Sequence, residues 1–189
     1  NDVDSTEVVV RREGDHLRIT IPSTGDSVLI EHQFDGTNTS AQSTSLESVD
    51  FADGVSWTFE DLMAEAVEGT EGDDVINGFT SDETINGGNG ADEIDGHEGA
   101  DTLLGGAGND DLEGGDGQDE LFGGLGDDQL RGGNADDALH GGEGSDVLYG
   151  GDGSDVLAGG AGDDDLRGDQ GDDVYLFSKG DGADTIYDA

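Results

Sequence analysis

Residues 123–131 read Gly-Gly-Leu-Gly-Asp-Asp-Gln-Leu-Arg, and this nine-residue block decides the fold. Its first six residues are mostly glycine and aspartate, which tolerate tight reversals and positive φ angles. Its last three residues alternate polar, apolar and polar, which is the pattern of a short strand with one side chain pointing inward. The block therefore predicts a six-residue turn followed by a three-residue strand.

Twelve such blocks follow one another without a gap over residues 69–176. Every block has glycine at its first position, an acidic residue at its sixth and a large apolar residue at its eighth. The fourth position is glycine except at Ser81 and Ala135, and Ala135 is tolerated there if its φ is negative. A fixed short period is the signature of a solenoid. Two blocks make one coil, so the repeats predict six coils of a flattened parallel β-solenoid, stacked about 4.8 Å apart.

The acidic sixth positions are expected to form one column on each side of the solenoid. The first column is Asp74, Asp92, Asp110, Asp128, Asp146 and Asp164, and the second is Glu83, Asp101, Asp119, Asp137, Asp155 and Asp173. Carboxylates at strand spacing repel one another unless a cation lies between them. Oxygen ligands in a flexible arrangement favour calcium over magnesium, which requires a tight octahedron. Zinc is disfavoured because the chain has no cysteine and its four histidines show no ligand spacing.

The composition predicts that folding depends on this cation. The chain carries 48 acidic and 6 basic residues, a formal net charge of −42, and such self-repulsion destabilises a compact state. Its 36 glycines add backbone entropy to be lost on folding, while each repeat contributes only about one large apolar side chain. A merely solvated or halophilic acidic surface would scatter its acids instead of keeping a nine-residue phase. We therefore expect the repeats to be disordered without calcium and to fold when it binds.

Several function classes are disfavoured by the same residues. The glycine-rich turns do not predict a phosphate-binding loop, because the acidic column beside them would repel a phosphate. So few basic residues argue against a nucleic-acid partner. The sequence contains no signal peptide, membrane span or catalytic motif, so we expect no enzyme within this segment.

The blocks resemble the nonapeptide G-G-x-G-x-D-x-U-x of RTX (haemolysin-type) proteins, a calcium-binding β-helix repeat. The resemblance implies an all-β fold, a right-handed parallel β-roll with Ca²⁺ between neighbouring turns of the same side. It also implies at most about ten ions, because six turns on a side leave five slots. Glu83 is left out of the ligand set because it is longer than Asp and its block lacks two glycines. The implied carboxylate ligands are Asp74, Asp92, Asp101, Asp110, Asp119, Asp128, Asp137, Asp146, Asp155, Asp164 and Asp173. The turn glycines implied to lend backbone carbonyls are Gly90, Gly99, Gly108, Gly117, Gly126, Gly144, Gly153 and Gly162.

Residues 1–68 are a different kind of sequence and predict a β-rich capping module. The expected strands cover residues 8–12, 16–21, 27–33 and 46–51. A capping box at Thr58–Asp61 predicts a short helix over residues 59–67. Residues 25–30 and 46–57 resemble the haemolysin-type calcium-binding-related module that often precedes RTX repeats. A cap of this kind would cover the open strand edges of a solenoid.

At the other end, residues 180–186 match the repeat again, but their phase is shifted by two residues, so Phe177 and Ser178 interrupt the coil. We expect residues 177–189 to be a degenerate repeat and the start of a truncated C-terminal cap, with flanking domains in a longer chain.

The RTX resemblance implies a protein of the cell exterior or the cell surface. Such proteins leave the cell unfolded through a type I secretion system and fold in calcium-rich surroundings. Two alternatives remain open. One is an adhesin or interaction module that binds a surface, a glycan or a protein, although the outward seventh and ninth positions show no regular ligand ladder. The other is the C-terminal part of a secreted hydrolase whose catalytic domain lies elsewhere.

Overall fold

The computed structural model describes residues 9–13, 16–21, 26–30, 48–50, 55–58 and 67–187. The chain divides into two compact units, residues 1–67 and residues 68–189. The described residues form strands and their connections, without a helix. The helix expected over residues 59–67 lies outside the described residues, except for Val67, which is part of a turn.

The first unit contains two small antiparallel sheets. One has the order β1-β2-β3 and the other pairs β4 with β5. The bounds are β1 Val9–Glu13, β2 His16–Ile21, β3 Asp26–Ile30, β4 Ser48–Asp50 and β5 Ser56–Thr58. The four expected strands are confirmed with small shifts of their ends. β5 was not expected as a strand, because three residues are too few to show an alternating pattern.

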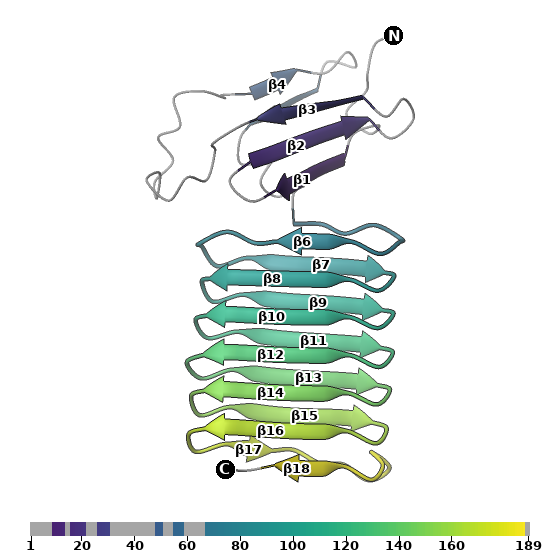
Figure 1. Ribbon diagram of the computed structural model, residues 1–189, viewed down its shortest axis with the longest axis vertical. Helices are drawn as coiled ribbons and strands as arrows, with labels where there is room; N and C mark the ends of the chain where they lie inside the picture. Colours follow the sequence, from purple (N-terminus) through teal and green to yellow (C-terminus); the bar gives the residue numbers. More distant parts are fainter. Residues whose placement is uncertain are drawn as a thin grey trace. The chain divides into compact units, whose positions relative to one another are not determined.

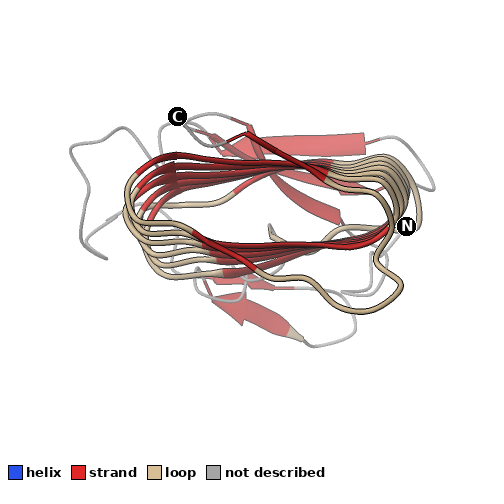
Figure 2. Cartoon of the chain, turned by 90° about the horizontal axis from the view of Figure 1, so that it is seen from below, coloured by secondary structure: helices blue, strands red, loops and turns tan. Residues whose placement is uncertain are grey.

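The second unit is the parallel β-roll that the repeats predict. Odd and even strands form two separate parallel sheets, with the orders β17-β15-β13-β11-β9-β7 and β18-β16-β14-β12-β10-β8-β6. Figure 1 shows these strands stacked along the roll, and the end-on view in Figure 2 shows two flat walls joined by turns. The first strands are β6 Val75–Asn77, β7 Thr84–Asn89, β8 Glu93–Glu98, β9 Thr102–Ala107, β10 Asp111–Asp116 and β11 Glu120–Leu125. They are followed by β12 Gln129–Asn134, β13 Ala138–Glu143, β14 Val147–Asp152, β15 Val156–Ala161, β16 Asp165–Gln170, β17 Val174–Tyr175 and β18 Thr185–Tyr187.

The strands inside the roll are six residues long, so the expected three-residue strand is wrong. In β12 the ladder continues beyond Arg131 through the glycines of the next block, and Gly133 pairs with Gly151. Glycine still carries the N–H and C=O groups that a ladder needs, and a neighbouring coil on each side supplies their partners. The turn is therefore shortened to the fourth, fifth and sixth positions of the repeat.

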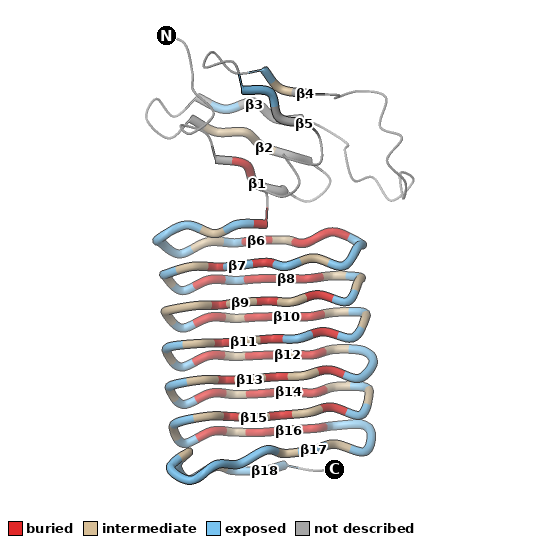
Figure 3. The backbone as a smooth tube through the Cα atoms, turned by 180° about the vertical axis from the view of Figure 1, so that it is seen from behind, coloured by how far each residue is buried: buried red, intermediate tan, exposed pale blue. Residues whose placement is uncertain are grey.

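Two ladders of apolar side chains, one from each sheet, fill the roll. The eighth-position residues from Ile76 to Leu166 are at most 1% exposed, and each lies opposite the same position of the next coil, as Leu112 lies opposite Leu130. Figure 3 shows the resulting alternation of buried and exposed residues along each coil. Each such side chain contributes about 1.5–3 kcal/mol of burial free energy, and these two ladders make up most of the buried apolar core of the described roll.

The last repeat joins the roll in spite of its shifted phase. Leu166 of β16 lies opposite Ile186 of β18, twenty residues later instead of eighteen. The two additional residues are accommodated in the connection between β17 and β18, so the ladder of even strands gains one more member.

Candidate metal centre

The sixth-position aspartates form the two expected columns, one at each edge of the roll. From Asp92 onward, one carboxylate oxygen of each aspartate accepts a hydrogen bond from the backbone of the preceding coil. The N–H of Asp110 donates to Oδ1 of Asp128, and the N–H of Asp128 donates to Oδ1 of Asp146, both at 2.8 Å. The second column repeats this bond, for example from Asp119 to Asp137 at 2.8 Å. These bonds fix the orientation of every carboxylate along the column.

The other carboxylate oxygen, Oδ2, is buried and has no hydrogen-bond partner in the protein. Within the described residues this holds for Asp101, Asp110, Asp119, Asp128, Asp137, Asp146, Asp155, Asp164 and Asp173. From Asp101 to Asp164 these residues are at most 3% exposed. A buried oxygen without a donor is costly, so a repeated row of such oxygens indicates that something other than a protein group is bound there.

First-position glycines make the space into which Oδ2 projects. A Cβ atom built on Gly132 would overlap Oδ2 of Asp137 and would lie 2.6 Å from the carbonyl oxygen of Gly150. The same conflict recurs at Gly105 with Asp110 and Gly123. A carboxylate oxygen and a backbone carbonyl oxygen thus approach the same position, which only glycine leaves open.

Fourth-position glycines are required by the backbone itself. All eight glycines that the resemblance implies as carbonyl ligands of the ion have φ between 118° and 156°, a region that residues with a side chain disfavour. A Cβ on Gly126 would in addition overlap the carbonyl oxygen of Gly108 in the preceding coil. Ala135 adopts φ 85°, so the condition of a negative φ for this residue is not met. The neighbouring coils impose the turn geometry on Ala135, and its backbone is strained.

The donor set suits a hard cation with oxygen ligands. Within the described residues, no three His, Cys, Asp or Glu side chains gather into one cluster. The buried Oδ2 atoms of stacked carboxylates, with the carbonyl oxygens of first-position glycines such as Gly150 close by, are the oxygens that this arrangement offers. Calcium accepts such mixed oxygen sets, whereas zinc prefers nitrogen and sulfur.

Comparison with known families agrees with this chemistry. The model of the RTX calcium-binding nonapeptide repeat matches four times, at residues 64–94, 77–112, 113–148 and 140–175. The chain belongs to the RTX family. Residues 16–61 match the haemolysin-type calcium binding protein related domain, in agreement with the resemblance seen in the first unit. No curated protein matches the chain in sequence. RTX repeats bind Ca²⁺ between turns, so calcium is the ion of this roll.

Burial changes the acidity of the RTX aspartates. Loss of hydration raises the pKa of Asp101, Asp128 and Asp137 to about 7, against the effect of the backbone hydrogen bond. The pKa of Asp146 is raised to about 6 by the same cause. Carboxylates of adjacent coils contribute further. The pKa values of the remaining interior aspartates are also raised, mainly by burial, at Asp110, Asp119, Asp155 and Asp164. Without a cation, the folded column thus disfavours its own ionised form.

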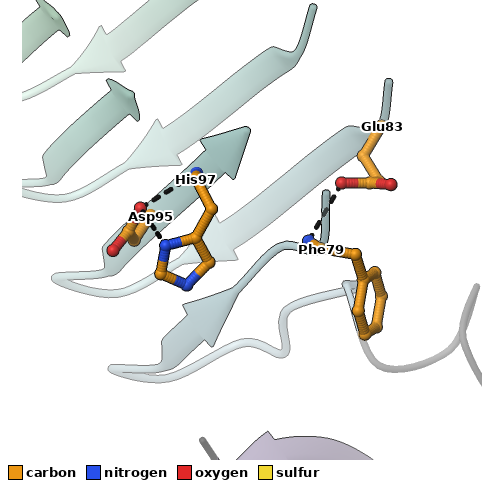
Figure 4. A network of polar contacts seen from close by, with 4 residues as sticks. All are labelled: Phe79, Glu83, Asp95 and His97. Atoms are coloured by element: carbon orange, nitrogen blue, oxygen red, sulfur yellow. Dashed lines mark hydrogen bonds and ion pairs between the residues drawn. The ribbon is translucent and has the colours of Figure 1, made fainter. Parts of the chain in front are cut away.

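The first two repeats satisfy their carboxylates differently. The backbone N–H and the hydroxyl of Thr70 donate to Oδ2 of Asp74 at 2.6 and 2.7 Å. The N–H of Phe79 donates to Oε2 of Glu83 at 3.0 Å, and the hydroxyl of Ser81 donates to its Oε1. Figure 4 shows the Phe79–Glu83 contact. Both carboxylates therefore hydrogen-bond within their own turns, which sets Asp74 apart from the other expected ligands.

His97 is a second departure from the glycine pattern in this part of the roll. It occupies the second position of its repeat with φ 74°. Its backbone N–H and its Nδ1 both lie close to Oδ1 of Asp95, at 3.0 and 3.1 Å (Figure 4). This local contact compensates in part for a backbone conformation that favours glycine.

The structure adds residues that the sequence reasoning missed. The N–H of Asp164 donates to Oδ1 of Asp184 at 3.2 Å, so Asp184 extends the first column by one residue. The shifted repeat at residues 180–186 was the available signal. At the fifth position, Asp127 and Asp136 accept hydrogen bonds from the N–H groups of Ser145 and Ser154, both at 2.8 Å. This outer row is exposed and links successive turns.

Proposed function

We propose that this chain is a calcium-gated folding module of a secreted protein. The observation that carries the proposal is the double row of buried aspartate Oδ2 atoms without protein donors. A compact roll with these oxygens ionised and unpaired is unfavourable, so the repeats stay unfolded until cations are available.

The proposed ligands are the stacked aspartates and the carbonyl oxygens of their turns. An interior aspartate such as Asp128 then serves two slots, one shared with Asp110 and one with Asp146. The corresponding slots at the other edge lie between pairs such as Asp119 and Asp137. Bound Ca²⁺ supplies the positive charge that lets adjacent carboxylates approach one another. The proposed carboxylate ligands are Asp92, Asp101, Asp110, Asp119, Asp128, Asp137, Asp146, Asp155, Asp164 and Asp173, with Asp74 and Asp184 at the ends of the first column.

The chain's own residues prepare these slots. The N–H to Oδ1 bonds hold one oxygen of each carboxylate, which leaves Oδ2 as the oxygen free to bind. First-position glycines keep the adjacent space open, and fourth-position glycines allow the turn to reverse. The two apolar ladders then stack only when the coils are drawn together, so that binding and folding are coupled.

The cellular setting follows from this coupling. RTX repeats are typical of secreted proteins, which suggests an extracellular location. We propose that the chain leaves the cell unfolded by a type I system, since cytosolic calcium is too low to fold it, and that it folds outside. The roll serves as a structural calcium-binding module and not as a catalytic one. No helix in the described part of the chain is long and apolar enough to cross a membrane.

A calcium titration followed by far-UV circular dichroism tests the proposal. Starting from a calcium-free solution, we expect a cooperative gain of β signal with Ca²⁺ and none with the same concentration of Mg²⁺. A spectrum already folded without calcium and unchanged by its addition would refute calcium-gated folding.

A further inference from the structure

The two walls of the roll differ in the side chains that they present to solvent. Repeats alternate between the walls, so reading the chain in order mixes two patterns that the structure separates. The seventh and ninth positions of each repeat point outward, on either side of the buried eighth position. From β9 to β17 the odd wall carries Thr102, Leu104, Glu120, Phe122, Ala138, His140, Val156, Ala158, Val174 and Leu176. From β8 to β16 the even wall carries Glu93, Asp95, Asp111, Glu113, Gln129, Arg131, Val147, Tyr149, Asp165 and Arg167.

Among these ten outward positions of the odd wall, Glu120 is the only Asp, Glu, Lys or Arg residue. The even wall has seven such residues among its ten. Beyond Glu120 the odd wall continues with Ala138, His140 and only apolar residues to Leu176. Over all residues of the odd-wall strands, only Glu120 and Glu143 are acidic or basic, and in a chain with 48 acidic residues this is a marked departure from the composition.

The odd wall also exposes apolar surface. Val174 is 48% exposed and Leu176 is 47% exposed at its C-terminal end. The rings of Phe122 and His140 stack at 4.9 Å with an interplanar angle of 10°, which makes a flat surface in the middle of the wall. Exposed apolar and aromatic side chains on a wall with so little charge are typical of an interaction site.

The two arginines of the even wall contact side chains of the same wall. Arg131 pairs with Asp111 of the adjacent coil. The guanidinium of Arg167 lies over the rings of Tyr149 and Tyr187, at 5.4 and 4.5 Å from their centroids. These cross-strand contacts are enough to account for the arginines and tyrosines of this wall.

We propose that the odd wall, from β9 to β17, is the surface on which a second copy of this chain docks. Both edges of the roll carry acidic columns, and the even wall is densely charged. Two copies of so acidic a chain therefore meet with the least like-charge contact through their odd walls. Flat sheets pack face to face with about 10 Å between them, and a two-fold axis makes one surface complementary to itself. The proposal rests on calcium-gated folding, because the wall exists only in the folded roll.

The size of the wall predicts how strong this association is. Four six-residue strands and the two residues of β17, at about 4.8 Å between strands and about 3.3 Å per residue, give roughly 400 Å² on each copy. A standard stable interface buries about 800 Å² on each partner. We therefore expect reversible association that increases with protein concentration, and not a permanent dimer.

Sedimentation equilibrium of the whole 189-residue chain in Ca²⁺ tests the proposal, at about 0.15 M salt so that long-range repulsion is screened. Two substitutions form a matched pair, Val156→Glu on the odd wall and Val147→Glu on the even wall. Both valines are half-buried, occupy the seventh position and begin strands that are consecutive in the chain but belong to different sheets. Each substitution adds the same charge to the chain, so the comparison separates the effect of the wall from that of net charge.

For the native chain we expect the average mass to rise with concentration from 19.3 kDa toward twice that value. Val156→Glu should weaken association by roughly tenfold or more, and Val147→Glu should leave it nearly unchanged. A native chain that is folded but monomeric at every concentration overturns the proposal, and so does an equal effect of both substitutions. Circular dichroism of the same samples shows whether calcium has folded each chain, which distinguishes a failure of docking from a failure of folding. If the folded chain sediments with neutral lipid vesicles but does not associate with itself, the wall is a membrane-binding surface and the proposal is likewise overturned.

Discussion

The first coil and the central coils of the roll follow one repeat but satisfy their carboxylates in two ways. In the first coil, Asp74 and Glu83 accept hydrogen bonds from donors of their own turns. In the central coils, Oδ2 of Asp128 and of Asp137 has no such donor. Thr70 and Ser81 stand where the central repeats have glycine, and their hydroxyl groups serve as donors. Glycine in the central turns therefore has two effects. It permits the chain to reverse, and because it has no hydroxyl group it cannot donate to the carboxylate as Thr70 and Ser81 do in the first coil.

The largest difference between the two regions should appear when glycine is replaced by alanine at the fourth position. Gly126→Ala places a Cβ against the carbonyl oxygen of Gly108 at φ 125°, and we expect a loss of roughly 2–5 kcal/mol in the free energy of unfolding. Gly72→Ala, in the first coil, meets no atom within 4 Å and should change stability by less than about 1 kcal/mol. Chemical denaturation in excess calcium measures both. Similar losses at the two positions would show that the first coil is built like the central ones.

Removing a carboxylate should affect calcium binding more in the centre than at the start. Asp128→Ala removes a ligand that we propose to be shared by two slots, whereas Asp74→Ala removes one already bonded to Thr70. We expect the calcium midpoint of folding to rise by about tenfold for Asp128→Ala, equivalent to about 1.4 kcal/mol, and by much less for Asp74→Ala. Asp173→Ala, at the end of the second column, should lie between them. Equal shifts for all three variants would contradict sharing between adjacent slots.

Protons should partly replace calcium in the central coils. The pKa values of Asp128 and Asp137 are raised to about 7 in the folded roll, above the value of about 4 expected in the unfolded chain. The folded state therefore binds more protons between these limits, and the calcium-free roll should gain stability as the pH falls from about 7 to about 4. It should lose that stability as the pH rises through the same range.

Far-UV circular dichroism in metal-free buffer at pH 5 and pH 8 measures this dependence as a gain of β signal at the lower pH. The double variant Asp128→Asn, Asp137→Asn is the control, because its amides do not titrate and the difference between the two pH values should shrink. An unchanged difference would assign the effect to the net charge of the chain and not to these buried carboxylates.

The smallest effect is expected where a central turn departs from glycine. Ala135→Gly relieves a residue held at φ 85° and should raise stability by about 0.5–1 kcal/mol in the presence of calcium. Ala161→Gly is the control, because Ala161 is exposed at the end of β15 and is not among the residues with positive φ. This second change should be neutral or destabilising by a similar amount. A loss of stability for Ala135→Gly would show that its methyl group contributes packing that outweighs the strain.

Much of the metal centre could be read from the repeats because each functional role keeps one position in a nine-residue period. The sixth-position acids, the first-position glycines and the apolar eighth position all occupy the places that the pattern gives them. The environment of Asp74 and Glu83 could not be read in this way, because it depends on which neighbouring side chains can turn back toward the carboxylate. The length of the strands was also misjudged, since glycine shows no strand preference in a sequence but pairs once a neighbouring coil is present.

By itself, the sequence determined the solenoid, the two acidic columns and the preference for an oxygen-seeking cation, since these follow from period and chemical type. Only the tertiary structure decided that Asp184 joins the first column, that Ala135 is held at positive φ, and that one wall is nearly free of charge. Each of these depends on contacts between residues eighteen or twenty positions apart, across the coils. The sequence specifies which residues repeat, but stacking decides which repeats become neighbours, and the energy of a carboxylate depends on its neighbours.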